Sequence, residues 1–177
     1  MWKRNCTARF LAVAGALGLG GCANLVDETP TPETRQVRIA EMIAEYRALF
    51  PEVEGLDAAA VAEALETGSA VIVDVRPEPE RRVSMIPGAI ALEEFEARAD
   101  ELAGSRVITY CTIGHRSSDT ASELSAKGWD AANFDGSLLA WTHAGGELID
   151  SEGRPTRRLH VFGRRWDLVA DGYEAVW

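Results

Sequence analysis

The sequence predicts an α/β domain with a mainly parallel central sheet flanked by helices. The run Ala70-Val-Ile-Val-Asp74 is apolar without alternation, which is typical of a strand covered on both faces, and the short β-branched run within 106–111 is predicted to be the next buried strand. Segments with helical spacing of apolar residues lie around these runs, and such alternation of strand and helix favours a parallel sheet. The length of 177 residues fits a single domain with a modest additional arm.

The first residues are predicted to form a signal peptide rather than part of the fold. Lys3, Arg4 and Arg9 form a basic start, and residues 10–19 are apolar but fall short of the roughly 20 residues that span a bilayer. The stretch Leu19-Gly-Gly-Cys22 resembles a bacterial lipobox, which implies cleavage before Cys22 and a lipid on its sulfur. We therefore expect a signal peptide over 1–21 and a polar tether over 22–36.

This resemblance also implies a location. Ala23 follows Cys22 where an aspartate would direct a lipoprotein to the inner membrane, so the usual sorting rule implies the periplasmic face of the outer membrane. We expect a protein of the cell envelope that is held to the membrane through the lipid on Cys22. The alternative is an ordinary secretory signal in which Cys22 is incidental.

Charge and cysteine content narrow the possible partners. The net charge of −10 at pH 7 disfavours nucleic acid as a partner, because its phosphates are also negative. Cys6 would leave with the signal peptide and Cys22 would carry the lipid, so Cys111 would be the only free thiol of the mature chain. An unpaired thiol in an oxidising compartment suggests a reactive group.

The secondary structure elements follow from apolar spacing and from the residues that begin and end helices. A helix is expected over 37–50, where Pro51 stops it, and a second over 58–66, with Asp57 as its N-cap and Gly68 at its end. The remaining expected elements are strand 70–74, a charged loop 76–82, an extended piece 86–90, helix 92–102, strand 106–111, helix 116–127, strand 131–134 and a short helix 138–141. Together they place the domain over 37–145.

Residues 146–177 are expected to form a C-terminal arm rich in aromatic residues and arginine. In the preferred interpretation the arm packs on the core and buries Phe162, Trp166 and Trp177. The alternative is a cover over the functional site, in which Arg164 or Arg165 adds positive charge for an anionic ligand.

The segment 107–118 carries the clearest functional signal. A predicted strand ends on Cys111, a tight loop containing Gly114 follows, and Arg116 opens a predicted helix. A thiol in this place faces backbone N–H groups and the positive end of a helix, which favour a thiolate and an anion beside it. Arg116 keeps its charge and presents a fork of donors to an oxyanion.

Four segments together resemble the rhodanese family of sulfurtransferase domains over about residues 55–145. They are Val73-Asp-Val-Arg76, Ile86-Pro-Gly-Ala-Ile90, Tyr110-Cys-Thr-Ile-Gly-His-Arg-Ser117 and Asp135-Gly-Ser-Leu-Leu-Ala-Trp141. The resemblance implies transfer of sulfane sulfur from a small anionic donor such as thiosulfate, through a persulfide on Cys111, to an external thiol or other nucleophile. Two departures from the family pattern, Ser84-Met85 before Ile86 and Ser137 after Gly136, affect local loop geometry.

The resemblance also implies residue roles. Cys111 is the expected nucleophile and Arg116 the anion contact. The expected substrate-binding residues are those of the loop around the sulfur, namely Thr112, Ile113, Gly114, His115 and Ser117. For His115 we favour a solvated loop position over a proton donor, and for Asp74 and Arg76 a structural role.

Two alternative functions stay open. A phosphatase or arsenate reductase could use the same thiolate and arginine, but five residues commonly separate them there, and four do here. The smaller ring of N–H groups suits a sulfur atom better than a tetrahedral oxyanion. The other alternative is an envelope binding or sensing module in which Cys111 carries sulfur with little turnover. No cofactor or metal is expected, because His115, His143 and His160 show no ligand spacing.

Overall fold

The computed structural model describes residues 30–177. The predicted signal peptide and the predicted lipidation site Cys22 lie outside the described residues. Among the helices that are described, none has both the length and the hydrophobicity needed to cross a membrane.

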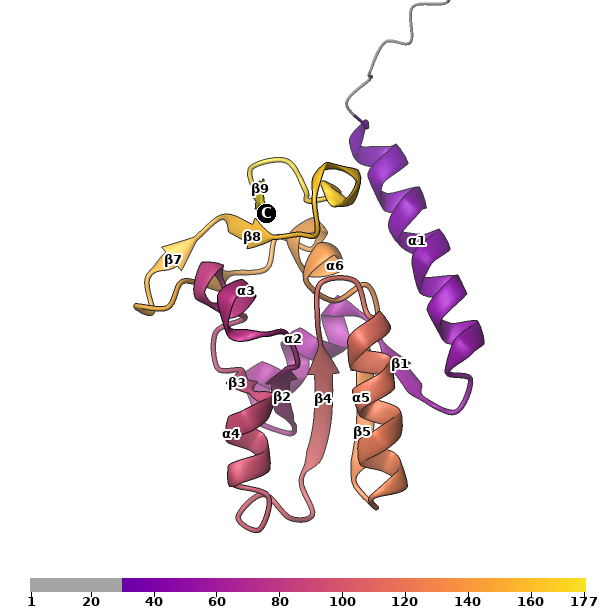
Figure 1. Ribbon diagram of the computed structural model, residues 1–177, viewed down its shortest axis with the longest axis vertical. Coiled ribbons are helices and arrows are strands. Elements are labelled where there is room, and N and C mark those ends of the chain that lie inside the picture. The colour runs from indigo at the N-terminus through magenta and orange to yellow at the C-terminus, as the bar shows by residue number, and fades with distance from the viewer. Residues whose placement is uncertain (1–29) are drawn as a thin grey trace, which may run out of the picture.

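Five parallel strands form the central sheet, in the spatial order β1-β5-β4-β2-β3 (Figure 1). The predicted α/β class with a mainly parallel sheet is therefore confirmed. The strands are β1 (Glu54–Leu56), β2 (Val71–Asp74), β3 (Ile90–Ala91), β4 (Arg106–Tyr110) and β5 (Asp130–Phe134). β4 is central and pairs with β2 on one side and with β5 on the other.

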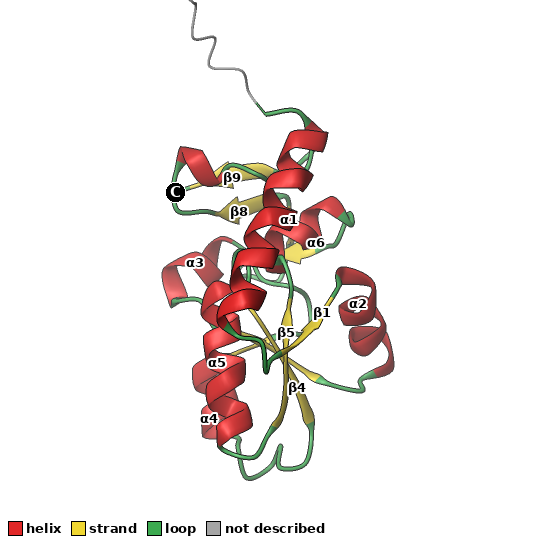
Figure 2. Ribbon diagram, turned by 90° about the vertical axis from the view of Figure 1, so that its right-hand side faces the viewer, coloured by secondary structure: helices red, strands yellow, loops and turns green. Residues whose placement is uncertain are grey.

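Helices cover both faces of this sheet (Figure 2). α4 (Leu92–Ala97) and α5 (His115–Ala126) cover one face, where Val73 and Val107 pack with Phe95 and Leu124. α2 (Ala58–Thr67) and α6 (Ser137–His143) cover the other face, joined by α1 (Pro32–Leu49), and this larger core includes Ile72 and Ile108. Neighbouring residues of β2 and of β4 thus point to opposite faces, as the pleat of a strand requires, and both faces are buried.

The predicted signals at the ends of α2 are confirmed. Asp57 caps the helix, since its Oδ1 accepts a hydrogen bond from the backbone N–H of Ala60 at 2.9 Å. Gly68 ends the helix in the left-handed conformation, with φ of 64°.

Several element boundaries differ from the sequence-based expectation. α1 begins at Pro32 rather than at residue 37, because Thr31 acts as its N-cap and proline is well tolerated at the first helical position. The charged loop expected over 76–82 was wrong: it contains α3 (Glu78–Val83), whose proline lies in the first turn, where its missing N–H costs nothing. The helix expected over 92–102 ends at Ala97 and continues as turns, and β1 was not anticipated.

The arm after α6 lies across the carboxyl ends of the strands, at the top of Figure 1. It contains β6 (Leu148–Ile149), β7 (Pro155–Thr156), β8 (Arg158–His160), the short 3-10 helix η1 (Arg164–Trp166) and β9 (Glu174–Val176). β6 pairs with β7 in antiparallel fashion, and β8 pairs with β9 in parallel.

Aliphatic residues anchor this arm to the core. The buried ones are Leu148, Leu159, Val161, Leu168 and Val169. The expectation that Phe162 and Trp177 are buried was wrong, because their side chains are 52% and 62% exposed. Trp166 is partly buried against the same core. The arm therefore packs on the domain while keeping aromatic rings at its surface.

Candidate active site

Cys111 lies immediately after β4, at the carboxyl end of the sheet, and its side chain is almost completely buried. The loop 112–114 then turns the chain into α5, which begins at His115. Gly114 makes this turn with a backbone φ of 122°, a conformation that residues with a Cβ atom rarely adopt. The sequence order of strand, thiol, glycine loop and helix therefore produces the predicted local geometry.

The backbone of the loop is oriented by α6. The N–H groups of Leu138 and Leu139 donate to the carbonyls of Cys111 and Thr112 at 3.3 and 3.0 Å. With these carbonyls tied to α6, the following N–H groups are free to face the sulfur. The N–H of Gly114 donates to Cys111 Sγ at 3.1 Å.

The thiol is tuned toward its ionised form. Burial by itself raises the pKa of Cys111. A hydrogen bond from the Ser117 hydroxyl, the positive charge of Arg116 and the N–H groups of Ser117 and Gly114 more than reverse this effect, so the pKa lies below the ordinary cysteine value. A thiolate is the reactive form of cysteine, so these contacts prepare Cys111 to act as a nucleophile.

The Ser117 hydroxyl has other acceptors besides the sulfur. Its Oγ lies 2.6 Å from Asn133 Oδ1 and 3.2 Å from the Gly114 carbonyl. A hydroxyl carries one hydrogen, so it can stabilise the thiolate only by turning away from these oxygens. The backbone N–H groups are fixed, and we regard them as the steadier source of the lowered pKa of Cys111.

Arg116 contacts a carboxylate that the sequence analysis did not single out. Its two terminal nitrogens donate to the carboxylate oxygens of Glu80 at 2.8 and 2.9 Å, and one of them also donates to Thr112 Oγ1 at 3.3 Å. Burial raises the pKa of Glu80, but the hydrogen bond and charge of Arg116 outweigh this and hold it below its ordinary value. Glu80 is therefore an ionised, buried partner that already neutralises Arg116.

Glu80 was missed because its segment resembled a charged loop. In the structure it lies on α3, which places its side chain against the start of α5. The one available signal was the proline of the first turn of α3, which is compatible with a helix N-terminus.

Ser137 also contributes to the site, although it occupies a place where the family pattern has glycine. Its hydroxyl accepts a hydrogen bond from the Cys111 N–H at 3.1 Å and donates one to the Phe134 carbonyl at 2.8 Å. Among the described residues it is the one non-glycine residue with positive φ, at 45°. The departure from the pattern therefore keeps the backbone conformation and adds a contact to the nucleophile.

A cavity of about 390 Å³ opens over Cys111. Its lining consists of Tyr46, Cys111, Ile113, His115, Arg116, Phe162 and Trp166. Of the predicted site residues, Cys111, Ile113, His115 and Arg116 thus meet in one pocket. Thr112 and Ser117 are buried beneath it, where they hydrogen-bond to Glu80 and to Asn133.

His115 and the arm differ from their expected surroundings. The His115 ring is exposed, yet it packs edge-to-face against Tyr46 and Phe50, with ring centroids 5.2 and 5.8 Å apart. Phe162 and Trp166, expected in the core, instead line the cavity over Cys111. The arm is therefore both packed on the core and placed over the site, but it contributes aromatic rings there rather than Arg164 or Arg165.

Asp74 and Arg76 brace the fold beside the site. Both side chains are fully buried, and Arg76 donates to both carboxylate oxygens of Asp74 and to the Ser84 carbonyl. Neither lines the cavity over Cys111. Their geometry is that of a structural ion pair.

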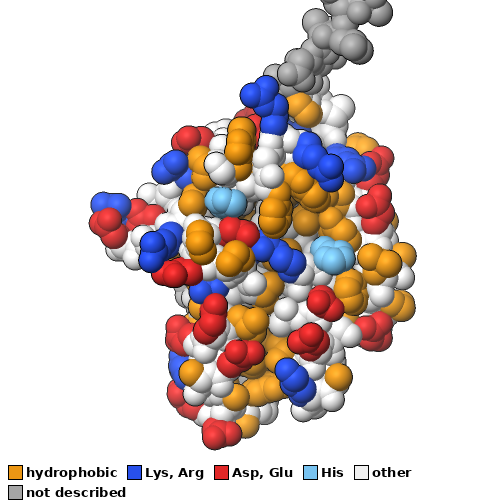
Figure 3. Space-filling model, viewed as in Figure 1, with side chains coloured by type: hydrophobic (Ala, Val, Ile, Leu, Met, Phe, Trp, Pro, Cys, Tyr) orange, Lys and Arg blue, Asp and Glu red, His pale blue; other side chains and the backbone are white. Residues whose placement is uncertain are grey.

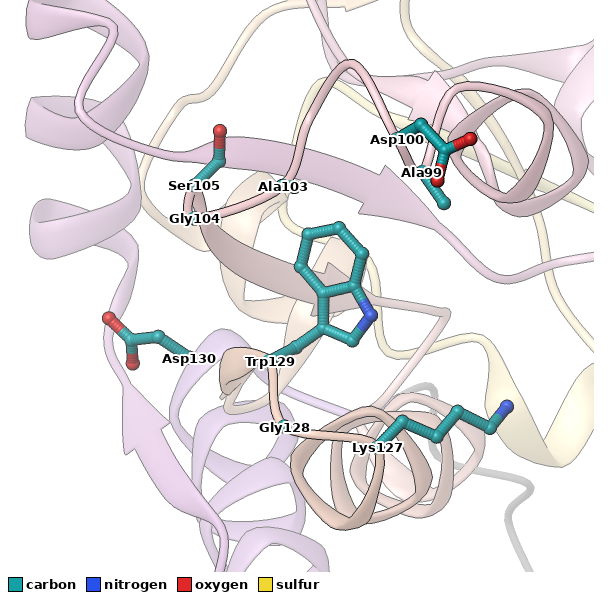
Figure 4. A pocket seen from close by; sticks show the side chains of 9 residues that line it. All are labelled: Ala99, Asp100, Ala103, Gly104, Ser105, Lys127, Gly128, Trp129 and Asp130. Carbon is teal, nitrogen blue, oxygen red and sulfur yellow. The ribbon is translucent and has the colours of Figure 1, made fainter.

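A second cavity of about 420 Å³ lies at the opposite end of the sheet, around Trp129 (Figure 4). It is formed by the loops that precede β4 and β5, and its lining contains neither cysteine nor histidine. Residues 30–177 contain no group of three or more histidine, cysteine, aspartate or glutamate side chains placed to hold a metal ion. The nucleophile, its arginine and the aromatic pocket are therefore all at the carboxyl end of the sheet.

Comparisons with known proteins agree with this geometry. Residues 57–144 match the model of the rhodanese-like domain family. The structure is similar to a thiosulfate sulfurtransferase from Pseudomonas aeruginosa, with 28% identity and a TM-score of 0.53, over 73% of this chain and 26% of that one. The BH2092 protein from Bacillus halodurans shares the fold at 20% identity and a TM-score of 0.50, over 62% of this chain and 86% of that one.

One relative of known sequence is named as a transcriptional regulator rather than as a sulfurtransferase. The HTH-type transcriptional regulator Rv0324 from Mycobacterium tuberculosis is 33% identical over 130 residues, which make up 68% of this chain and 57% of the regulator. The chain thus spans little more than half of the regulator and about a quarter of the sulfurtransferase.

Proposed function

Because residues 57–144 belong to the rhodanese-like domain family, we propose that this protein is a sulfurtransferase that carries sulfane sulfur as a persulfide on Cys111. The observation that carries the proposal is the 3.1 Å contact between the Gly114 N–H and Cys111 Sγ, at the floor of an open pocket. An N–H group in this position stabilises a thiolate, and it can equally stabilise the terminal sulfur of a persulfide.

The first step is a displacement at sulfur. The Cys111 thiolate attacks the sulfane sulfur of the donor, the S–S bond of the donor breaks, and the leaving group departs with the electron pair. With thiosulfate, the donor expected from the sequence, the leaving group is sulfite. The product is Cys111–S–S⁻, and no external oxidant or reductant is needed.

The second step returns the sulfur to an acceptor. The thiolate of an external thiol attacks the outer sulfur of the persulfide, and Cys111 leaves as a thiolate that the N–H groups stabilise again. Cys111 is the one cysteine among the described residues, so within residues 30–177 there is no second thiol to accept the sulfur. The acceptor in this proposal is therefore a separate molecule.

Mass spectrometry of the intact protein tests this proposal. After incubation with a sulfane-sulfur donor, the protein should gain the mass of one sulfur atom, and an added thiol should remove it. Cys111→Ser is the matched control, and it should gain nothing. An unmodified wild-type protein after treatment with every donor tried would overturn the proposal.

A phosphatase or arsenate reductase is the less favoured activity on this scaffold. Four residues separate Cys111 from Arg116, and Arg116 is already paired with Glu80. Both features reduce the capacity of the loop to bind a tetrahedral oxyanion. Turnover of an aryl phosphate that depends on Cys111 would reverse this ranking.

The similarity to a transcriptional regulator favours one further candidate, a sensing module in which Cys111 holds sulfur with little turnover. The two functions differ in kinetics. A sulfurtransferase forms many equivalents of product per protein when donor and acceptor are both in excess, whereas a sensor stops near one equivalent.

We also propose that the domain is held at the cell envelope by a lipid on Cys22. The support is the lipobox-like stretch ending at Cys22, which lies outside the described residues. Metabolic labelling with a fatty acid tests it: the label should enter the wild-type protein and not the Cys22→Ala variant.

A further inference from the structure

Two segments outside the family domain build an aromatic wall over Cys111. We use this name for Tyr46 of α1 and for Phe162 and Trp166 of the arm, all of which line the cavity. The family match covers 57–144, so none of the three belongs to it. In the view of Figure 3, hydrophobic side chains gather on the half of this face that carries the arm. The wall is therefore formed by segments that lie outside the family match.

Phe162 is the most accessible part of the aromatic wall. Its ring lies over the Arg116 guanidinium, with 4.7 Å from Cζ to the ring centroid, and packs edge-to-face with Trp166 at 5.9 Å. It nevertheless stays 52% exposed. An exposed aromatic ring beside a buried nucleophile offers an apolar surface that a bound molecule can cover.

The charges of the pocket do not favour a dianion. The positive charge of Arg116 is matched by Glu80, with contacts of 2.8 and 2.9 Å, and the Cys111 thiolate adds a second negative charge. Arg165 lies over the ring of Trp166 at 5.2 Å but does not line the cavity. Because Glu80 and the thiolate together outweigh Arg116, an incoming anion with two charges is poorly compensated.

We propose that the sulfur donor of this site is an organic sulfane-sulfur compound with a ring-sized apolar group, such as an organic persulfide or thiosulfonate, in preference to thiosulfate. This inference rests on the proposed sulfurtransferase function and specifies its substrate class. The apolar group lies against the aromatic wall while the sulfane sulfur reaches Cys111. A cavity of about 390 Å³ accommodates a molecule of this size.

The chemistry balances with a thiosulfonate as the probe. The Cys111 thiolate attacks the sulfane sulfur of benzenethiosulfonate, and the bond between this sulfur and the sulfonyl sulfur breaks. Benzenesulfinate leaves with the electron pair, and Cys111–S–S⁻ forms. Each side of the reaction carries two negative charges, and no proton or oxidant is required.

Comparison of three donors distinguishes the effect of the apolar group from the effect of the donor's charge on persulfide formation. Benzenethiosulfonate and methanethiosulfonate carry one negative charge each and differ in the ring, whereas thiosulfate carries two charges and no apolar group. We expect persulfide formation on Cys111, measured as kcat/KM and divided by the rate of the same donor with free cysteine, to be at least about tenfold faster with the benzene compound than with either of the others.

Two variants assign this preference to the aromatic wall. Phe162→Ala should remove most of the preference for the benzene compound over methanethiosulfonate, and it should fold normally because Phe162 is 52% exposed. Trp177→Ala is the matched control, an exposed aromatic residue of the same arm that does not line the cavity, and it should keep the preference.

The outcomes distinguish this inference from the proposed function. Equal or faster persulfide formation with thiosulfate overturns the inference and leaves the sulfurtransferase function intact. A preference for the benzene compound that survives Phe162→Ala also overturns it. No persulfide from any of the three donors means that the proposed function itself fails.

Discussion

Glu80 and Arg116 form a two-pronged ion pair beside the nucleophile, with nitrogen–oxygen distances of 2.8 and 2.9 Å. Glu80 comes from α3 and Arg116 from α5, so the pair also joins two elements that flank the site. Thr112 Oγ1 lies within hydrogen-bonding distance of both side chains. The carboxylate therefore fixes Arg116 in place and at the same time reduces the positive charge available to a substrate.

Replacing Glu80 with glutamine should change substrate preference in a defined direction. Without the carboxylate charge, Arg116 attracts anions more strongly, so kcat/KM for thiosulfate should rise relative to benzenethiosulfonate. Glu93→Gln is the matched control, since Glu93 pairs with Arg81 at the surface and is far more exposed. If both variants keep the wild-type ratio of the two donors, the pair does not control the charge of the pocket.

The same Glu80→Gln variant should be less stable at neutral pH. We expect a loss of about 1–2 kcal/mol by urea unfolding, less than for a fully buried pair because the Arg116 side chain is 32% exposed. The pKa of Glu80 is below its ordinary value in the folded protein, so its contribution is present above the unfolded-state pKa of about 4.3 and is lost as pH falls through the folded-state pKa. The stability difference between wild type and variant should therefore shrink below about pH 4.

The reactivity of Cys111 should rise at a lower pH than that of free cysteine. Burial raises the pKa of Cys111. The Ser117 hydroxyl, the Arg116 charge and the N–H groups lower this pKa by a larger amount, so the net shift is downward. The midpoint of iodoacetamide alkylation against pH should lie below the value of about 8.5 that free cysteine shows. Ser117→Ala should move this midpoint upward, and a midpoint equal to that of free cysteine in the wild type would remove the basis of the site.

The thiol also links stability to pH. A lowered pKa means that the stabilisation from Cys111 is present above the unfolded-state pKa and is lost as pH falls through the folded-state pKa. Relative to Cys111→Ser, the wild-type protein should therefore gain stability as pH rises through this interval. Thermal unfolding of both proteins across the interval measures the gain, and a parallel pH dependence would contradict it.

The sequence was sufficient for strands β2, β4 and β5 of the central sheet and for the loop that carries Cys111, because these depend on local signals, whereas the edge strand β1 was not anticipated. Continuous apolar runs mark buried strands, and Asp57 and Gly68 mark the ends of α2 by hydrogen-bonding and backbone preferences of single residues. The rhodanese-like domain expected over about 55–145 is matched at 57–144.

The aromatic wall and the Glu80 contact could not be predicted in the same way, because they depend on how distant segments meet. Tyr46 and Phe162 are separated by more than half of the chain, and both approach Cys111 only after α1 and the arm have packed. Phe162 and Trp166 are residue types that commonly lie in protein cores. Here aliphatic residues of the arm fill the core, and the two aromatic rings lie over the site. Periodicity identifies a helix or a strand, but not which part of the surface it covers.

Asp74→Asn should destabilise the protein strongly while leaving the chemistry of the folded molecules unchanged. The Asp74 and Arg76 side chains are both fully buried, so removing the carboxylate charge leaves the Arg76 guanidinium uncompensated, at a cost of about 3–5 kcal/mol. Glu94→Gln, which breaks an exposed pair with Arg98, is the control and should cost less than about 1 kcal/mol. Urea unfolding measures both. Since neither Asp74 nor Arg76 lines the cavity, the rate per folded molecule should stay at the wild-type value.

Two substitutions of Ser137 distinguish the cost of its backbone conformation from the contribution of its hydrogen bond to Cys111. Its positive φ of 45° disfavours any residue with a Cβ by about 1–2 kcal/mol, and its hydroxyl accepts the Cys111 N–H at 3.1 Å. Both Ser137→Gly and Ser137→Ala remove the hydroxyl and leave the buried Cys111 N–H unpaired, but only the glycine variant also relieves the backbone strain. The alanine variant should therefore be less stable than the glycine variant by about 1 kcal/mol in urea unfolding.

The hydrogen bond itself is measured by amide exchange. In both variants the Cys111 N–H loses its acceptor, so its exchange should be faster than in the wild type, while amides in the middle of β4 should change only as much as global stability does. An alanine variant as stable as the glycine variant would show that the conformation at Ser137 is not strained. Unchanged exchange at Cys111 would show that the hydroxyl does not hold the nucleophile.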